Sequence, residues 1–190
     1  ACIEKTVDFE PMLTLYLTEE TKAEDLVLAF REKIIKAVKL YPAGATTNSH
    51  NGVKNITKIY PILAAMSEEG IPLLIHGEVT DPSIDVFDRE AVFIDKILVP
   101  MRLEYPDLKI VMEHITTKQS VDYIVGENSN IAATITPHHL IFNRNVMFEG
   151  GIRPHYYCLP VLKREIHRQA LIDVVMKGHK KFFLGTDSAP

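Results

Sequence analysis

The sequence predicts an α/β fold in which parallel strands alternate with helices. Two observations lead to this class. Short apolar runs rich in β-branched residues recur along the chain and are bounded by turn residues, as buried strands are. Longer segments between them carry apolar residues at helical spacing. The regular alternation of strand and helix predicts parallel strands that are joined by right-handed crossovers. Such strands form either a doubly wound sheet or a barrel.

Six apolar runs have the length and residue types of buried strands. The predicted strands are residues 12–17, 37–41, 72–76, 109–115, 131–136 and 181–185.

Five segments between the strands have helical periodicity, and several carry signals for a helix end. Gly70 and Gly178 stand where a helix would close on a left-handed residue, and Thr117 stands where it would cap a helix start. The region 137–160 is predicted to be irregular, and a loop of that length is typically functional or disordered. The predicted helices are residues 21–36, 56–69, 85–104, 118–125 and 162–177.

Composition limits the classes of partner. The chain has 190 residues, 46% of them hydrophobic, and no apolar run approaches the roughly 20 residues needed to span a bilayer. The net charge of −4, without a basic run, argues against nucleic acid and anionic membranes as partners. Two cysteines fit a reducing cytoplasm, although one disulfide remains possible. We therefore expect a cytoplasmic protein that binds a small molecule.

Polar residues close four of the predicted strands. With period two, Val38 and Leu40 face one side of their strand and Lys39 faces the other. Lys39, His76, His114 and Asp187 are separated by 37, 38 and 73 residues, which match one, one and two strand–helix units. Alone, each residue could be a solvated lysine, a core histidine or a turn aspartate. Together, at the same end of successive strands, they predict a metal site.

This arrangement favours a (β/α)₈ (TIM) barrel, because barrel active sites form at the carboxyl ends of the strands. A typical barrel has about 250 residues, or about 31 per unit, so 190 residues correspond to about six of eight units. We expect residues 1–190 to be a single partial barrel domain that lacks the first two units and a C-terminal part. Both ends of the chain look cut from a larger protein.

Six motifs in this chain resemble dihydroorotases of the bacterial, homodimeric type, in the amidohydrolase superfamily. The similarity runs through nearly the whole chain, with the motifs in the family's order. They are K-L-Y-P-A-G-A-T-T-N from Lys39, P-L-L-I-H-G-E-V-T from Pro72, V-M-E-H-I-T-T from Val111, A-A-T-I-T-P-H-H-L from Ala132, G-G-I-R-P-H-Y-Y-C-L-P from Gly150 and F-L-G-T-D-S-A-P from Phe183.

The resemblance implies two zinc ions bridged by Lys39, carboxylated on its amine. It places His76 and His114 on one zinc and Asp187 on the other, with Asp187 also the catalytic acid–base group. Zinc polarises a carbonyl and lowers the pKa of bound water toward about 7. The implied reaction is the reversible conversion of dihydroorotate and water to N-carbamoyl-L-aspartate in pyrimidine synthesis.

The resemblance also implies substrate contacts. Thr46 and Thr47 would lie on a mobile loop that closes over the substrate carboxylate, and the main chain of Leu159 would bind the pyrimidine ring. The complete protein would be a homodimer. We carry over no metal role for His138 and His139, for which surface or structural roles are favoured, as they are for His155 and Arg153.

Departures from the family pattern leave alternatives open. The family's H-x-H strand, its carboxylate-binding Arg and a substrate Asn have no counterpart here, and the chain ends just before a further substrate His. We therefore expect little or no activity from these 190 residues alone. The alternatives are a hydantoinase-like or allantoinase-like cyclic amidase, and a non-catalytic, dihydroorotase-like structural subunit.

Overall fold

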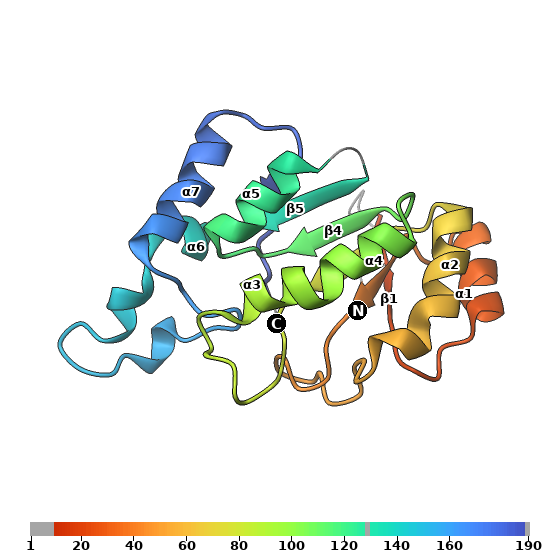
Figure 1. Cartoon of the computed structure of the whole chain (residues 1–190), viewed down its shortest axis with the longest axis horizontal. Coiled ribbons are helices and arrows are strands. Elements are labelled where there is room, and N and C mark those ends of the chain that lie inside the picture. Colours follow the sequence, from red (N-terminus) through yellow and green to blue (C-terminus); the bar gives the residue numbers. More distant parts are fainter. Residues whose placement is uncertain (1–9, 128–129, 189–190) are drawn as a thin grey trace.

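A six-stranded, all-parallel sheet forms the centre of the protein (Figure 1). The computed structural model describes residues 10–127 and 130–188. All six predicted strands are present, each shorter than predicted by one to three residues. Their bounds are β1 (Thr14–Tyr16), β2 (Ala37–Leu40), β3 (Leu73–His76), β4 (Ile110–Glu113), β5 (Ile131–Ile135) and β6 (Phe182–Leu184).

The order of the strands decides between the two sheet architectures. Each strand pairs in parallel with the next strand along the chain, in the order β1-β2-β3-β4-β5-β6. A doubly wound sheet would reverse its strand order at a switch point, and this sheet does not. The fold is therefore the curved, singly wound arrangement of a partial barrel, as the sequence predicted.

Helices follow most strands and cover one face of the sheet (Figure 1). A 3₁₀ turn, Ile56–Ile59, leads into α2, and a π turn, Ile94–Leu98, joins α3 to α4. The helices are α1 (Ala23–Arg31), α2 (Tyr60–Glu69), α3 (Arg89–Phe93), α4 (Val99–Glu104), α5 (Lys118–Gly126), α6 (Pro137–Ile141) and α7 (Glu165–Met176).

Two predictions about the connections need correction. The helix predicted from residue 85 begins only at Arg89, after a turn held by the Asp85 carboxylate, which accepts from the Phe87 amide at 2.8 Å. The region 137–160 is not wholly irregular, because α6 begins at Pro137 and two 3₁₀ turns, Arg144–Met147 and Pro154–Tyr156, follow it. Proline fits the first position of a helix, where no amide donor is needed, so α6 starts directly after β5.

The helix-end signals lie where the sequence predicted them. Gly70 and Gly178 have φ angles of 67° and 61°, the left-handed conformation that glycine adopts at little cost. Thr117 caps α5, and its side chain accepts from the backbone amide of Ser120. Helices α2 and α7 therefore end at a glycine, and α5 begins at a threonine cap, as local sequence signals predict.

The hydrophobic core lies between the sheet and its helices. Val38 and Leu40 of β2 are fully buried in it, and Leu63 and Met66 of α2 belong to the same cluster. Lys39, between them, lies outside that apolar cluster. The two faces of the sheet therefore differ: one carries the core, and the other carries polar strand-end residues. Among the described residues, no helix is long and apolar enough to cross a membrane.

Candidate metal centre at the carboxyl ends of the strands

The four predicted ligands all stand at the carboxyl ends of parallel strands. Lys39 is the third residue of β2, and His76 is the last residue of β3. His114 follows β4 directly, and Asp187 comes three residues after β6. Because all strands run in one direction, these residues share one rim of the sheet.

Three of these residues lie close together. The rings of His76 and His114 stand edge to face, with centroids 4.8 Å apart. The Lys39 amine contacts the carboxylate of Glu113, which lies opposite His76 in the strand register. The same amine lies 4.8 Å from the centre of the Tyr41 ring. The rim of β2, β3 and β4 thus gathers one amine and two imidazoles.

Lys39 is buried, with 7% of its surface exposed. Burial lowers the pKa of its amine, because an ammonium ion is costly to remove from water. The carboxylates of Glu113 and Asp187 act in the opposite direction, but burial is the larger effect. The neutral amine, which is the form that reacts with carbon dioxide, is therefore more accessible here than on an exposed lysine.

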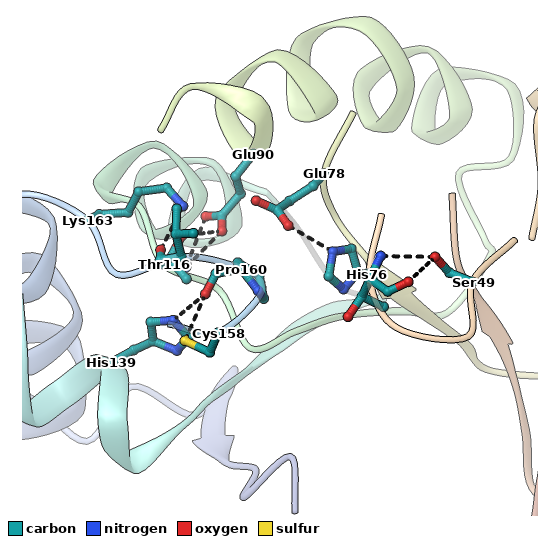
Figure 2. A network of polar contacts seen from close by, with 11 residues as sticks. Ser49, His76, Glu78, Glu90, Thr116, His139, Cys158, Pro160 and Lys163 are labelled. Carbon is teal, nitrogen blue, oxygen red and sulfur yellow. Dashed lines mark hydrogen bonds and ion pairs between the residues drawn. The ribbon is translucent and has the colours of Figure 1, made fainter. Parts of the chain in front are cut away.

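His76 is held by a buried carboxylate. Its Nε2 lies 2.9 Å from Oε2 of Glu78, and both side chains are almost fully buried (Figure 2). A carboxylate oxygen accepts hydrogen bonds, so Nε2 carries the hydrogen. The lone pair of the ring therefore lies on Nδ1, where a metal can use it.

His114 is buried and its Nδ1 has no hydrogen-bond partner among the described residues. Burial first, and then the charges of His76 and Lys39, lower the pKa of its ring well below the usual value. A neutral imidazole is the form that binds a divalent metal. Imidazole nitrogens are common zinc ligands, so the paired rings of His76 and His114 beside the buried amine of Lys39 fit a zinc site.

Two of the candidate ligands have a left-handed backbone. His114 has φ 44° and Asp187 has φ 51°, a conformation that costs a non-glycine residue free energy. Asp187 is exposed, and its charge acts on Lys39 and on His138. Strained conformations of this kind concentrate at functional sites, which is consistent with the role that the sequence suggested for these residues.

The loop after β2 holds Thr46 and Thr47 near the rim. Thr46 is half-buried and Thr47 is exposed. The buried Ser49 hydroxyl accepts from the Thr46 amide at 2.9 Å and donates to the Thr46 carbonyl at 2.5 Å. Gly52 is required at the base of the loop, since a Cβ there would lie 2.3 Å from the Tyr41 carbonyl oxygen. Hydrogen bonds between Ser49 and Thr46 therefore hold the base of the loop, and Thr47 is exposed to solvent.

Leu159 lies on the segment between α6 and α7 and is half-buried. Its peptide bond to Pro160 is cis, and the Pro160 carbonyl accepts from His139 Nε2 at 3.0 Å. Charges of Asp187 and Glu78 raise the pKa of the neighbouring Cys158 thiol, after the larger effect of burial. The segment of Leu159 therefore reaches the same rim.

A second group of metal-binding residue types lies beside the first. The ligand atoms of His138, His139 and Cys158 are all within 4.8 Å of one another. Both ring nitrogens of His139 are already engaged, Nδ1 with the Thr136 hydroxyl at 2.5 Å and Nε2 with the Pro160 carbonyl. A metal would have to break one of these buried bonds, so the structure favours a structural role for His139.

Sequence reasoning missed the carboxylates that contact the candidate ligands. Glu78 stands two residues after His76, and Glu113 directly precedes His114. A charged residue next to a strand-end histidine could have signalled a contact, but the same pattern is common in solvated loops. Lys163 is buried and donates to the Val161 carbonyl at 2.9 Å. No pattern in the neighbouring sequence indicates that this lysine is buried.

The same fold occurs in solved structures with little sequence identity to this chain. Crystal structures of a D-hydantoinase (19% identity, TM-score 0.74) and of dihydropyrimidinase from Brevibacillus agri (15%, TM-score 0.74) share it over 94% of this chain and 43% of theirs. No family model matches the chain.

Within that fold, the specific similarity is to dihydroorotases. Those of Chelativorans sp. (strain BNC1) and Cupriavidus necator are each 58% identical over all 190 residues, which cover 55% of each relative. A crystal structure of dihydroorotase from Campylobacter jejuni is 42% identical, with a TM-score of 0.85 over 95% of this chain and 52% of that one. The Saccharomyces cerevisiae dihydroorotase, solved with 5-fluoroorotic acid, is 33% identical with a TM-score of 0.85, over 94% of this chain and 52% of its own.

The resemblance to dihydroorotases that the motifs indicated is confirmed. The chain spans about half the length of the relatives that it matches.

Proposed function

We propose that this chain carries the central part of a zinc-dependent dihydroorotase active site, which interconverts dihydroorotate and N-carbamoyl-L-aspartate. The observation that carries the proposal is the rim of β2, β3 and β4. There a buried lysine with a lowered pKa lies beside two buried imidazoles, and one imidazole has a nitrogen with no partner in the part of the chain that the structure describes. The 58% identity to dihydroorotases supports the choice of dihydroorotate over other cyclic amides.

In this proposal, His76 and His114 would hold one zinc and Asp187 would contribute to the second. Lys39, carboxylated on its amine, would be a ligand of both. Zinc, when bound, supplies a Lewis acid and activates water at neutral pH. Carboxylation requires Lys39 to leave its contact with Glu113, and burial of the amine favours the neutral form that reacts.

Asp187 is the proposed acid–base group. Its carboxylate takes the proton from the attacking water and returns it to the amide nitrogen that leaves the ring. An exposed position at the rim suits this role, because the carboxylate must reach substrate.

Thr46 and Thr47 are the proposed donors to the substrate carboxylate, on a loop that closes and excludes water. The base of the loop is held by the hydrogen bonds between Ser49 and Thr46, and Thr47 is exposed. This arrangement is compatible with movement of the tip of the loop. The main chain of Leu159 is proposed to bind the pyrimidine ring. The complete enzyme is proposed to be a cytoplasmic homodimer, and residues 1–190 alone are proposed to be inactive.

The test is hydrolysis of dihydroorotate by the full-length protein that carries this sequence, with hydantoin and allantoin as competing substrates. We expect activity on dihydroorotate and loss of that activity in Lys39→Ala and Asp187→Asn. Preference for hydantoin or allantoin would contradict the substrate, and full activity of Lys39→Ala would contradict the metal bridge.

A further inference from the structure

Two glutamates are buried next to this rim, and they differ in what they bind. Glu78 and Glu90 are each only 2% exposed. Figure 2 shows Glu78 between His76 and the group formed by Glu90, Thr116 and Lys163. A buried carboxylate needs partners that offset its loss of water, so the partners indicate its role.

Glu90 is satisfied by the backbone and hydroxyls of the loop that starts α5. Its oxygens accept from the amides of Thr116 and Thr117 at 2.9–3.1 Å, and from their hydroxyls at 2.6 and 2.5 Å. The Ser120 hydroxyl also donates to it. These bonds join α3 to the start of α5, so Glu90 holds the fold together.

Glu78 makes a different set of contacts. One oxygen, Oε2, accepts from Nε2 of His76, and the other, Oε1, is buried without a hydrogen-bond partner among the described residues. A carboxylate placed only for stability would be expected to use both oxygens, as Glu90 does. The hydrogen bond to His76 is therefore the contact that accounts for the position of Glu78.

We propose that Glu78 is a positioning residue that fixes His76 with its hydrogen on Nε2 and so presents Nδ1 as the metal ligand. The inference rests on the proposed function, since it concerns the same centre. Carboxylate–histidine–metal contacts of this kind fix the ring orientation and make the ligand nitrogen more basic. Glu78 acts through His76 and does not touch the metal or the substrate.

The test compares zinc affinity among variants of the full-length protein, measured by competition with a chromophoric chelator. Glu78→Leu is expected to weaken zinc binding by about 10- to 100-fold, the usual effect of losing an outer-shell partner. Glu78→Gln is expected to recover much of that loss, because its carbonyl oxygen can accept the same hydrogen bond. Glu90→Gln is the matched control, expected to lower the free energy of unfolding and leave zinc affinity unchanged.

A second readout reports the ring itself. In the metal-free protein, ¹⁵N NMR of His76 is expected to show a protonated Nε2, and Glu78→Leu is expected to give a mixture of the two neutral forms. Unchanged zinc affinity in Glu78→Leu, or an equal loss in Glu90→Gln, would overturn the inference. Absence of zinc binding by the unsubstituted protein would instead overturn the proposed function.

Discussion

Two pairs of histidines lie on the same rim, and they differ in how their nitrogens are used. The rings of His76 and His114 have centroids 4.8 Å apart, and those of His138 and His139 are 4.4 Å apart. In the first pair, Nδ1 of His114 has no partner among the described residues and Nδ1 of His76 keeps its lone pair. In the second pair, both nitrogens of His139 are bonded to the protein.

Proximity of two histidines therefore does not by itself define a metal centre. A ligand nitrogen must keep a free lone pair in the folded protein, and buried polar groups otherwise find partners. On this criterion the first pair fits the proposed metal site better than the second. His139 of the second pair instead joins α6 to the segment of Pro160 through its hydrogen bond.

The largest expected effect is a difference in zinc affinity between two variants, each of which lacks one ring of one pair. His114→Ala should weaken zinc binding by more than the roughly 100-fold limit for outer-shell partners, because it deletes a proposed direct ligand. His139→Ala should leave zinc affinity unchanged and reduce stability. Competition titration with a chelator measures both variants of the full-length protein. Comparable losses of affinity in the two would abolish the distinction between the pairs.

His139 of the second pair should make the free energy of unfolding depend on pH. Burial, and then the charge of His138, lowers the pKa of His139 to about 4, whereas an unfolded histidine titrates near 6.5. Between these values the unfolded chain binds more protons, so the free energy of unfolding falls as pH decreases through this window. The loss is at most about 3 kcal/mol.

Urea denaturation at pH 7 and at pH 4.5, with a chelator present to remove metal, measures this loss. His139→Gln cannot titrate in this range and should show a smaller difference between the two pH values. His114 contributes a loss of the same sign, since its pKa is also lowered, and that part should remain. An identical pH dependence in the variant would show that His139 is not held neutral by the fold.

A smaller effect on stability is expected from removing the Thr136 hydroxyl, which is hydrogen-bonded to His139 Nδ1. Thr136→Val keeps the shape of the side chain and removes the hydrogen bond to Nδ1, at a cost of about 1–2 kcal/mol in the free energy of unfolding. It also frees a ring nitrogen beside Cys158. Chemical denaturation gives the stability, and elemental analysis should find no additional zinc; an extra equivalent would mean that only Thr136 keeps the second group from binding metal.

The smallest effect is expected at the thiol of that group. Cys158→Ser is expected to change the free energy of unfolding by about 1 kcal/mol or less, because the thiol makes only a 3.3 Å contact with the Pro160 carbonyl. Zinc affinity should be unchanged in the same titration. A clear loss of zinc would place Cys158 in the metal centre and contradict the role given to the second group.

The sequence predicted the fold well because its signals are local. The alternation of apolar residues predicted β2 and placed Lys39 on the face opposite the core, and a glycine predicted the end of α2. Helix α6 does not follow from the sequence pattern, because a proline directly after a strand is also typical of a loop. That position is equally good for starting a helix.

The candidate site was predictable only in its strand-end residues. Their regular spacing along the chain reflects the repeat of strand and helix, so sequence numbers carry spatial information. The partners of those residues follow no such rule. Glu90 meets Thr116 and Ser120 across 26 and 30 residues, and only the folded chain shows that these groups are joined.

The central proposal is that His76 and His114 would hold one zinc ion and that Lys39, carboxylated on its amine, would link it to a second. Its most direct test is native mass spectrometry of the full-length protein together with Lys39→Ala. The account predicts bound zinc and an added mass of one carbon dioxide in the unsubstituted protein, and loss of the added mass and of zinc in the variant. An unmodified lysine, or equal zinc content in both proteins, would contradict it.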